Sequence, residues 1–148
     1  RKIDLIVIHC SATREDRSLT PDDLETMHRR RGFNGTGYHY YIRKDGTVHL
    51  TRPIDRIGAH ARGFNAQSIG ICYEVVWIAG DVRQTRGTGS MIFAVALVNL
   101  LLEKFSGCRV CGHRDLSPDR NGNGEIEPEE WIKACPCFEV KDEFSRKR

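Results

Sequence analysis

The sequence contains no apolar run long enough to cross a membrane and no strong excess of either charge. The longest apolar segment, residues 91–102, is interrupted by Asn99 and is shorter than the roughly 20 residues that a spanning helix needs. No secretory hydrophobic segment opens the chain, and its first residue is Arg1 rather than Met, so the sequence assigns no compartment. The formal net charge of +3 suits an acidic or polymeric substrate but is too weak to indicate nucleic-acid binding. We therefore expect neither membrane insertion nor a nucleic-acid partner.

Internal repeats and low-complexity segments are also absent from the sequence. The 148 residues are 39% hydrophobic and 29% charged, which is ordinary for a soluble globular protein. A chain of this length buries most of its apolar surface in one core. We expect a single domain over residues 1–148 that acts as a monomer.

The cysteines allow more than one interpretation. The six are Cys10, Cys72, Cys108, Cys111, Cys135 and Cys137. The first two lie in apolar runs, where a cysteine is usually a small buried hydrophobe. The other four form a C-x-x-C and a C-P-C pair, and together they would be able to hold a structural zinc ion. We rank that alternative below a catalytic site, because Cys108 and Cys111 lie in an expected strand, where residues three apart point to opposite faces.

Several segments have the pattern of β-strands. Residues 3–10 form a continuous β-branched apolar run, which is typical of a central strand buried on both faces. Residues 69–76 have the pattern of a second buried strand, and residues 109–112 that of a shorter one. An aromatic strand at 38–43 and a strand at 48–50 flank the turn K-D-G-T, which predicts a hairpin.

The expected helices cover residues 21–31, 90–105 and 138–144. The first follows Thr20, a favourable N-cap residue, and has Pro21 at its first position. Leu24 and Met27 are expected to form its inward stripe. The second helix is apolar on nearly every side, so we expect it to be mostly buried.

Two histidines are expected at the carboxyl ends of strands, where open α/β sheets bind their ligands. His9 ends the first strand, before the polar turn S-A-T, and His113 directly follows the strand at 109–112. Imidazole and thiolate are good zinc donors, and a catalytic zinc takes three protein ligands with a fourth position open. Because Cys135 shares a short segment with His113, the sequence predicts a zinc site formed by His9, His113 and Cys135. The alternative for His9 is a satisfied core histidine.

Other polar residues are candidates for a groove beside the metal. Tyr38, which starts its strand next to glycines, is well placed to face a crevice. His60 lies in a loop of small residues and either lines a groove or is exposed; the sequence leaves both open. His28 is interpreted as packing or groove wall, and His39 and His49 as structural.

Residues 119–130 read D-R-N-G-N-G-E-I-E-P-E-E and match the calcium-binding loop of EF-hands without a mismatch. The expected calcium ligands are Asp119, Asn121, Asn123, Glu125 and Glu130. Gly124 would make the sharp turn. No helix is expected over 116–118, before the loop, whereas Pro128 opens a helical turn after it. We predict one structural calcium ion in this insert; the alternative is a solvated acidic loop.

Five motifs occur in the order found in one enzyme family. They are I-V-I-H-C-S-A-T, G-Y-H-Y-Y-I-R-K-D-G-T-V, G-A-H-A-R-G-F-N-A-Q-S-I-G-I-C, G-H-R-D-L-S-P and K-A-C-P-C-F. In these motifs the chain resembles the zinc-dependent N-acetylmuramoyl-L-alanine amidases of the phage lysozyme type, which are related to animal peptidoglycan recognition proteins. The resemblance covers nearly the whole chain and implies an α/β fold, with a mixed central β-sheet flanked by helices.

The resemblance also implies roles for individual residues. Motif by motif, the zinc ligands fall on His9, His113 and Cys135. The catalytic tyrosine and lysine fall on Tyr38 and Lys133. His60 and Asn65 match the loop that lines the substrate groove. Two departures are V-V-W at 75–77, where relatives often have Gly-Gly, and the insert at 119–130, which the shortest relatives lack.

The implied function is hydrolysis of peptidoglycan at the amide between N-acetylmuramic acid and L-alanine of the stem peptide. Such an enzyme acts on the cell wall, as a phage endolysin or as an exported bacterial enzyme. The first alternative is a peptidoglycan-binding module of the same fold without catalysis, but the presence of Cys135 favours the enzyme. The second alternative is a structural-zinc protein or calcium sensor.

Overall fold

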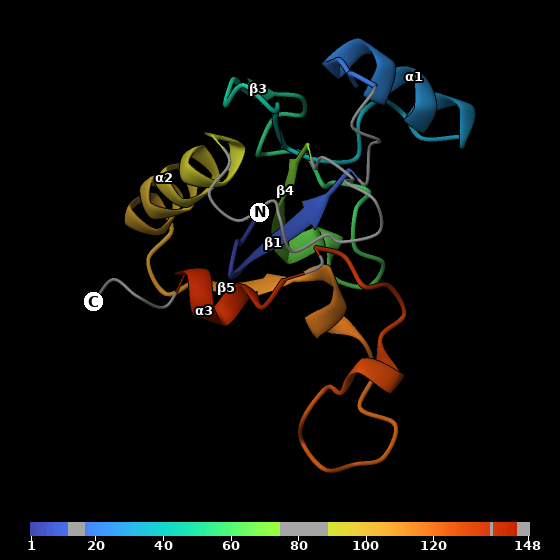
Figure 1. Cartoon of the computed structure of the whole chain (residues 1–148), viewed down its shortest axis with the longest axis vertical. Coiled ribbons are helices and arrows are strands. Elements are labelled where there is room, and N and C mark those ends of the chain that lie inside the picture. The colour runs from blue at the N-terminus through green and yellow to red at the C-terminus, as the bar shows by residue number, and fades with distance from the viewer. Residues whose placement is uncertain (12–16, 75–88, 137, 145–148) are drawn as a thin grey trace.

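The computed structural model describes residues 1–11, 17–74, 89–136 and 138–144. Its centre is a five-stranded sheet in the order β3-β2-β4-β1-β5 (Figure 1). The strands are β1 Leu5–Cys10, β2 Tyr40–Ile42, β3 Val48–Leu50, β4 Ser68–Tyr73 and β5 Arg109–Gly112. β1 lies between β4 and β5 and is parallel to both, β2 is parallel to β4, and only β3 is antiparallel to its neighbour β2. The expected mixed sheet is thus confirmed.

The helices are α1 Pro21–Arg30, α2 Gly89–Lys104 and α3 Val140–Phe144. The described residues also contain the short 3-10 turns η1 Asn65–Gln67, η3 His113–Leu116 and η4 Pro128–Glu130. α1 begins with a capping box, in which Thr20 and Asp23 each accept a hydrogen bond from the backbone N–H of the other. Among the described residues, no helix is long and apolar enough to span a bilayer.

The two faces of the sheet bury different side chains, because residues alternate along each strand. One face turns Ile6, Ile8, Ile69 and Ile71 towards α2 and α3 and forms the larger apolar core. The opposite face carries two smaller clusters. Their buried members are Leu5, Val7 and Cys111 in one and Leu24, Tyr41 and Cys72 in the other. β1 is therefore buried on both faces, as expected.

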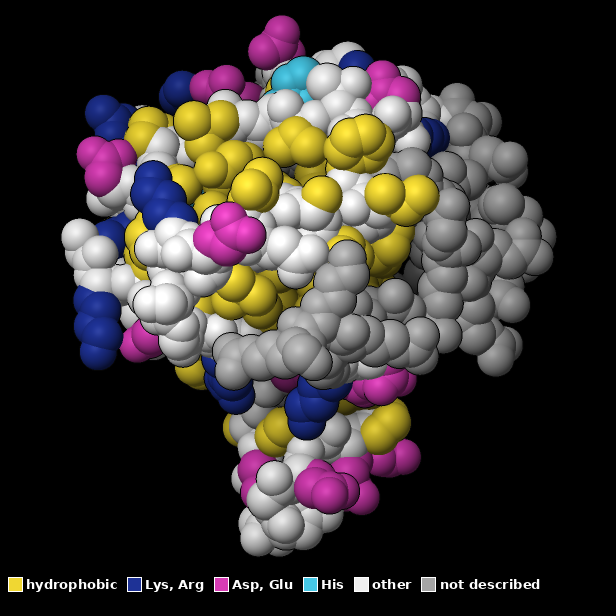
Figure 2. Space-filling model, turned by 90° about the vertical axis from the view of Figure 1, so that its left-hand side faces the viewer, with side chains coloured by type: hydrophobic (Ala, Val, Ile, Leu, Met, Phe, Trp, Pro, Cys, Tyr) yellow, Lys and Arg dark blue, Asp and Glu magenta, His cyan; other side chains and the backbone are white. Residues whose placement is uncertain are grey.

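Two expectations about helix burial are wrong. α2 exposes Ile92, Phe93 and Leu100 by 63%, 47% and 63%, and Figure 2 shows hydrophobic side chains gathered on the side of the molecule that carries this helix. A helix that is apolar all round has no polar face to mark its outer side, so its pattern does not reveal that it covers the sheet with one face only. In α1, Leu24 is buried but Met27 is 42% exposed.

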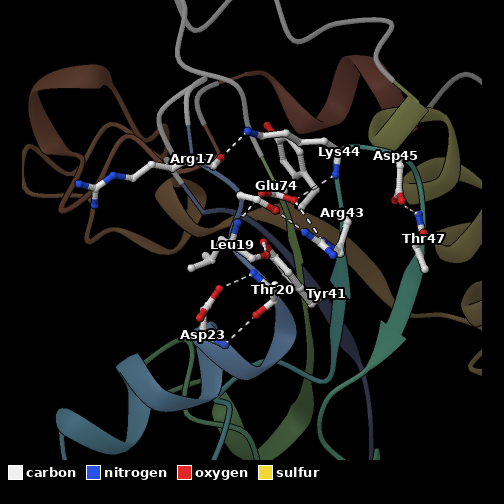
Figure 3. A network of polar contacts seen from close by, with 12 residues as sticks. Arg17, Leu19, Thr20, Asp23, Tyr41, Arg43, Lys44, Asp45, Thr47 and Glu74 are labelled. Carbon is white, nitrogen blue, oxygen red and sulfur yellow. Dashed lines mark hydrogen bonds and ion pairs between the residues drawn. The ribbon is translucent and has the colours of Figure 1, made fainter.

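A buried carboxylate ties the segment before α1 to the hairpin. Glu74, which follows β4, accepts hydrogen bonds from the N–H of Leu19 (2.9 Å) and of Lys44 (3.1 Å). Figure 3 shows this side chain between the two segments, with the Arg43 Nε 3.7 Å away. The contacts fix where α1 starts on the sheet, and α1 carries one wall of the groove described below. The expected strand extension over 75–76 and the V-V-W departure lie outside the described residues.

Candidate metal centre and active site

The three predicted zinc ligands converge on the sheet face opposite α2. His9 is the fifth residue of β1 and shares its face with Leu5 and Val7 rather than projecting from the strand end. His113 follows β5, the parallel neighbour of β1, so the two imidazole rings lie 4.7 Å apart. Cys135 Sγ is 3.8 Å from His9 Nδ1. One donor atom from each of the three side chains lies within 4.8 Å of the other two.

These separations fit a tetrahedral zinc ion. Zn–N and Zn–S bonds of about 2.05 and 2.3 Å at the tetrahedral angle place nitrogen and sulfur about 3.6 Å apart. The observed Sγ–Nδ1 separation of 3.8 Å needs almost no rearrangement. The backbone holds the thiol in place, because Cys135 Sγ accepts from the N–H of Cys10 (3.2 Å) and the Cys135 carbonyl accepts from the N–H of Arg114 (2.8 Å).

The structure argues against a zinc site built from the C-x-x-C pair. Cys108 packs against the core beneath α2, and its thiol donates to the Ile3 carbonyl at 3.3 Å. Cys111 lies on the other face, in the cluster with Leu5 and Val7. The two thiols therefore point to opposite sides of the sheet, as the strand assignment predicted.

Burial keeps both histidine ligands neutral. The pKa of His9 lies well below its ordinary 6.5, because the ring is buried and because His60, His113 and Lys133 lie close to it. The pKa of His113 is lowered by burial and by Lys133. A neutral imidazole keeps the lone pair that a metal ligand needs.

Tyr38 and Lys133 border the same site. The Tyr38 ring lies 4.9 Å from the His9 ring, and burial together with the neighbouring cysteine thiols raises the pKa of the phenol well above 10. Tyr38 is therefore protonated and able to donate a hydrogen bond. Lys133 is exposed on the groove wall, two residues before Cys135.

All five residues line a groove of about 810 Å³. Its size is in the range of sites that hold small molecules or short oligomers. His28 forms part of the wall, as one of its two interpretations expected, and its Nδ1 accepts from the N–H of Gly37 at 2.8 Å. Arg31 and Arg62, which no sequence motif singled out, also line the groove, and a cationic wall suits an anionic substrate.

His60 and Asn65 also line the groove, but their polar atoms are engaged within the protein. Asn65 Oδ1 accepts from the N–H of His60 and of Ala61, both at 2.9 Å. His60 is buried rather than exposed, with Nδ1 3.0 Å from His9 Nε2 and Nε2 3.1 Å from Ser68 Oγ. Burial, with smaller effects of neighbouring histidines and arginines, lowers the pKa of His60 to about 3.

The insert at 119–130 closes into a ring that projects from the body of the molecule (Figure 1). Asp119 accepts from the N–H of Gly122 (2.6 Å) and of Gly124 (2.8 Å), and both glycines have positive φ. Glu130 is buried and accepts from three loop N–H groups, those of Arg120, Asn121 and Glu127. The helical turn expected from Pro128 is present as η4, a single 3-10 turn that ends at Glu130, the last residue of the insert. The predicted ligand residues at positions 1 and 12 thus both face the inside of the loop backbone.

Comparison with known proteins identifies the family of the chain. The N-acetylmuramoyl-L-alanine amidase family matches residues 1–129, so Lys133 and Cys135 lie just beyond the matched region. The endolysin of Escherichia phage T7 is 30% identical over 145 residues, which are 93% of this chain and 83% of that protein. The endolysin of Klebsiella phage KP32 is 31% identical over 143 residues, covering 92% of this chain and 82% of that protein.

Solved structures give the same result. The N-acetylmuramoyl-L-alanine amidase LysC from Clostridium intestinale URNW is 28% identical with a TM-score of 0.73, over 99% of this chain and 87% of that chain. Drosophila PGRP-LB, at 22% identity and a TM-score of 0.65 over 91% of this chain and 75% of its own, shares the fold. The chain therefore belongs to the N-acetylmuramoyl-L-alanine amidase family and is an amidase of the type found in phage endolysins.

Proposed function

We propose that this amidase is a zinc-dependent peptidoglycan hydrolase that cleaves the bond between the lactyl group of N-acetylmuramic acid and L-alanine of the stem peptide. The observation that carries the proposal is the three-donor group His9, His113 and Cys135, which opens onto a groove bordered by Tyr38 and Lys133. The endolysin relatives support a cell-wall substrate, as does a solved complex of a Drosophila PGRP-LB variant with tracheal cytotoxin. We further propose that the enzyme acts as a monomer and without nucleic acid.

The chain's own residues have distinct tasks in this reaction. Zinc, when bound, supplies a Lewis acid that activates water at neutral pH and polarises the scissile carbonyl. As the carbonyl carbon becomes tetrahedral, its oxygen gains negative charge. The Lys133 ammonium lies on the wall of the groove and stabilises this charge. The protonated Tyr38 phenol donates a hydrogen bond to the same oxygen or to the leaving nitrogen.

The competing function is a binding module without catalysis. Both functions predict that the chain binds peptidoglycan, but only the enzyme creates new ends. The test is digestion of purified peptidoglycan with the zinc-loaded protein, followed by identification of the new termini. We expect free L-alanine amino groups and no new reducing sugars. Binding without new amino groups would assign the chain to the binding module, and new reducing sugars would indicate a glycosidase.

We also propose that the insert at 119–130 binds one calcium ion in a structural role. The support is the spacing of its oxygen-bearing side chains: Asp119, Asn121, Asn123, Glu125 and Glu130 occupy positions 1, 3, 5, 7 and 12 of a calcium loop. Glu125 would contribute its backbone carbonyl. Calcium would neutralise carboxylates that the folded loop brings together, which otherwise repel one another. Calorimetric titration with calcium tests this proposal.

The contacts after the loop connect it to the catalytic residues. Trp131 follows Glu130 and lies under the Arg114 guanidinium, which is 4.2 Å from the centre of its ring. The N–H of Ile132 donates to Ser117 Oγ at 3.0 Å. Lys133 comes next in the chain. A loop held rigid by calcium would therefore fix the segment that delivers Lys133 and Cys135 to the groove.

A further inference from the structure

His60 lies between a metal ligand and a serine on the floor of the site. Its Nδ1 is 3.0 Å from His9 Nε2, and its Nε2 is 3.1 Å from Ser68 Oγ. All three side chains are almost fully buried, at 9%, 1% and 0% exposure for His60, His9 and Ser68. Both ring nitrogens of His60 are thus occupied by protein partners, which leaves neither to bind substrate.

The register of β4 and two glycines make room for the His60 ring against the sheet. In the parallel register Ser68 pairs with Leu5, Gly70 with Val7 and Cys72 with His9, so these β4 residues share the face of the metal site. A Cβ on Gly70 would stand 2.6 Å from the His60 ring, and one on Gly58 would stand 2.7 Å from it. The absence of both side chains lets the ring lie against the strand, between Ser68 and His9.

The hydrogen bonds of this chain can run in only one direction when zinc is bound. His9 faces Cys135 with Nδ1, so Nδ1 must carry the lone pair that binds the metal. The proton of neutral His9 is then on Nε2, which donates to His60 Nδ1. His60 must in turn carry its proton on Nε2, which donates to Ser68 Oγ. Many zinc-bound histidines donate their second ring N–H to a carboxylate or a backbone carbonyl. Here the neutral imidazole of His60 is the acceptor of that hydrogen bond.

We propose that His60 is a positioning residue for the metal: as the acceptor for His9 Nε2–H, it holds the His9 ring in the orientation and tautomer that leave Nδ1 for zinc, while Ser68 Oγ accepts from His60 Nε2–H and holds the His60 ring in place. This role replaces the substrate contact that the resemblance implied for His60. The inference rests on the zinc site of the proposed function, but it concerns metal affinity rather than the bond that is cleaved.

The first test measures zinc affinity by competition with a chromophoric chelator. His60→Leu removes the acceptor and should weaken zinc binding by about 10- to 100-fold. His60→Asn, whose amide oxygen can take the place of Nδ1, should recover part of that loss, and Ser68→Ala should have a smaller effect of the same sign. His39→Gln is the matched control. His39 is equally buried and packs edge-on against His60, but it bonds to the backbone of Gly70 and Arg56 and to Arg1, not to a metal ligand. It should leave zinc affinity unchanged.

A second readout reports the tautomer directly. In zinc-loaded protein labelled with ¹⁵N-histidine, NMR should show His9 protonated at Nε2. That proton should exchange slowly with solvent in the wild type, faster in His60→Asn and fastest in His60→Leu. A His9 proton on Nδ1 would overturn the proposal. Zinc affinity equal to that of the wild type in Ser68→Ala and in both folded His60 variants would also overturn it. If KM alone rose in those His60 variants, His60 would be a substrate contact.

The outcomes separate this inference from the proposed function. If zinc affinity falls as expected but the wild-type protein releases no L-alanine amino groups from peptidoglycan, the positioning role stands and the proposed reaction is wrong. If the reaction is confirmed while the His60 variants bind zinc normally, the positioning role is wrong.

Discussion

Cys135 is the residue that best separates the proposed enzyme from the non-catalytic binding module and the structural-zinc protein. Its thiolate completes the three-donor set. We expect Cys135→Ala to lose zinc and to abolish hydrolysis, and His9→Ala and His113→Ala to do the same. Elemental analysis after dialysis measures the metal. Cys108→Ala is the control, since that thiol points to the other face of the sheet, and it should retain one zinc per chain. Loss of zinc from Cys108→Ala as well as from Cys135→Ala would instead indicate the structural zinc site built from the two cysteine pairs.

In the proposed reaction, Tyr38 and Lys133 act on the transition state rather than on the metal. Tyr38→Phe and Lys133→Ala should keep the fold and the zinc but lose turnover by roughly a hundredfold, if each removes one contact to the developing charge. Steady-state kinetics on soluble muropeptides, with zinc content measured on the same samples, provide the check. A rise in KM at constant kcat for both variants would show that they only bind substrate.

Among single residues, the sequence singled out His9, His113 and Cys135, which the structure brings together, but it did not indicate the position of His60 behind His9. The two histidines were expected where adjacent strands end, and Cys135 shares a short segment with His113, so the three donors could be grouped from the sequence. The role of His60 depends on two facts that no local pattern contains: the register that puts Ser68 and His9 on one face, and the missing side chain of Gly70. The local pattern therefore left open whether His60 lines a groove or is exposed, and the resemblance placed it in the loop that lines the substrate groove.

Among the elements, the insert at 119–130 carries the clearest prediction. Calcium should raise the melting temperature, because it binds the folded loop and not the unfolded chain. Asp119→Ala removes the first ligand and should abolish that gain while lowering activity indirectly. Glu129→Ala is the matched control: it removes an exposed carboxylate from the same loop at a position that contributes no ligand.

Two results would contradict the calcium proposal. Calorimetry without heat of binding, together with no thermal shift, would reduce the insert to an ordinary loop. A shift that persists in Asp119→Ala but disappears in Glu129→Ala would show that calcium binds nonspecifically to surface carboxylates.

The helices and strands themselves were largely predictable from local pattern. α1 and α2 begin and end within one residue of their expected bounds, because caps and glycines mark their ends. β1 begins two residues later than expected. β4 begins one residue earlier than expected and ends at Tyr73, before the described Glu74. The aromatic strand begins at Tyr40 rather than Tyr38, which leaves Tyr38 free of the ladder and turned into the groove.

For the molecule as a whole, the order of strands was not derivable from local pattern. Periodicity predicts that a strand is buried, but not which strands flank it. Only the resemblance implied a mixed sheet. In the structure the two faces of the sheet have different roles. One face packs against α2 and α3 and stabilises the fold. The other carries the neighbouring histidines from β1, from the end of β5 and from the loop before η1.

Concentrating neutral histidines inside the molecule has a consequence for stability. Burial lowers the pKa of His39 from its ordinary 6.5 to about 4. Between these two pH values the unfolded chain binds a proton that the folded chain does not, so the free energy of unfolding falls as the pH falls. The loss from one such group is at most about 1.4 kcal/mol per pH unit. Above pH 6.5 both states are neutral at this residue, and the contribution no longer changes.

Urea unfolding of the zinc-free protein at pH 7.5, 6 and 5 measures this dependence. The wild type should lose stability steadily below pH 6.5. His39→Gln should be less stable than the wild type at pH 7.5, because it loses buried hydrogen bonds, yet it should lose less with each step in pH, because one of the groups that resist protonation is gone. Equal pH dependence in the two proteins would show that His39 is not held neutral by the fold. The same variant serves as the control for zinc affinity, so one protein tests both that His39 supports the structure and that it takes no part in the metal site.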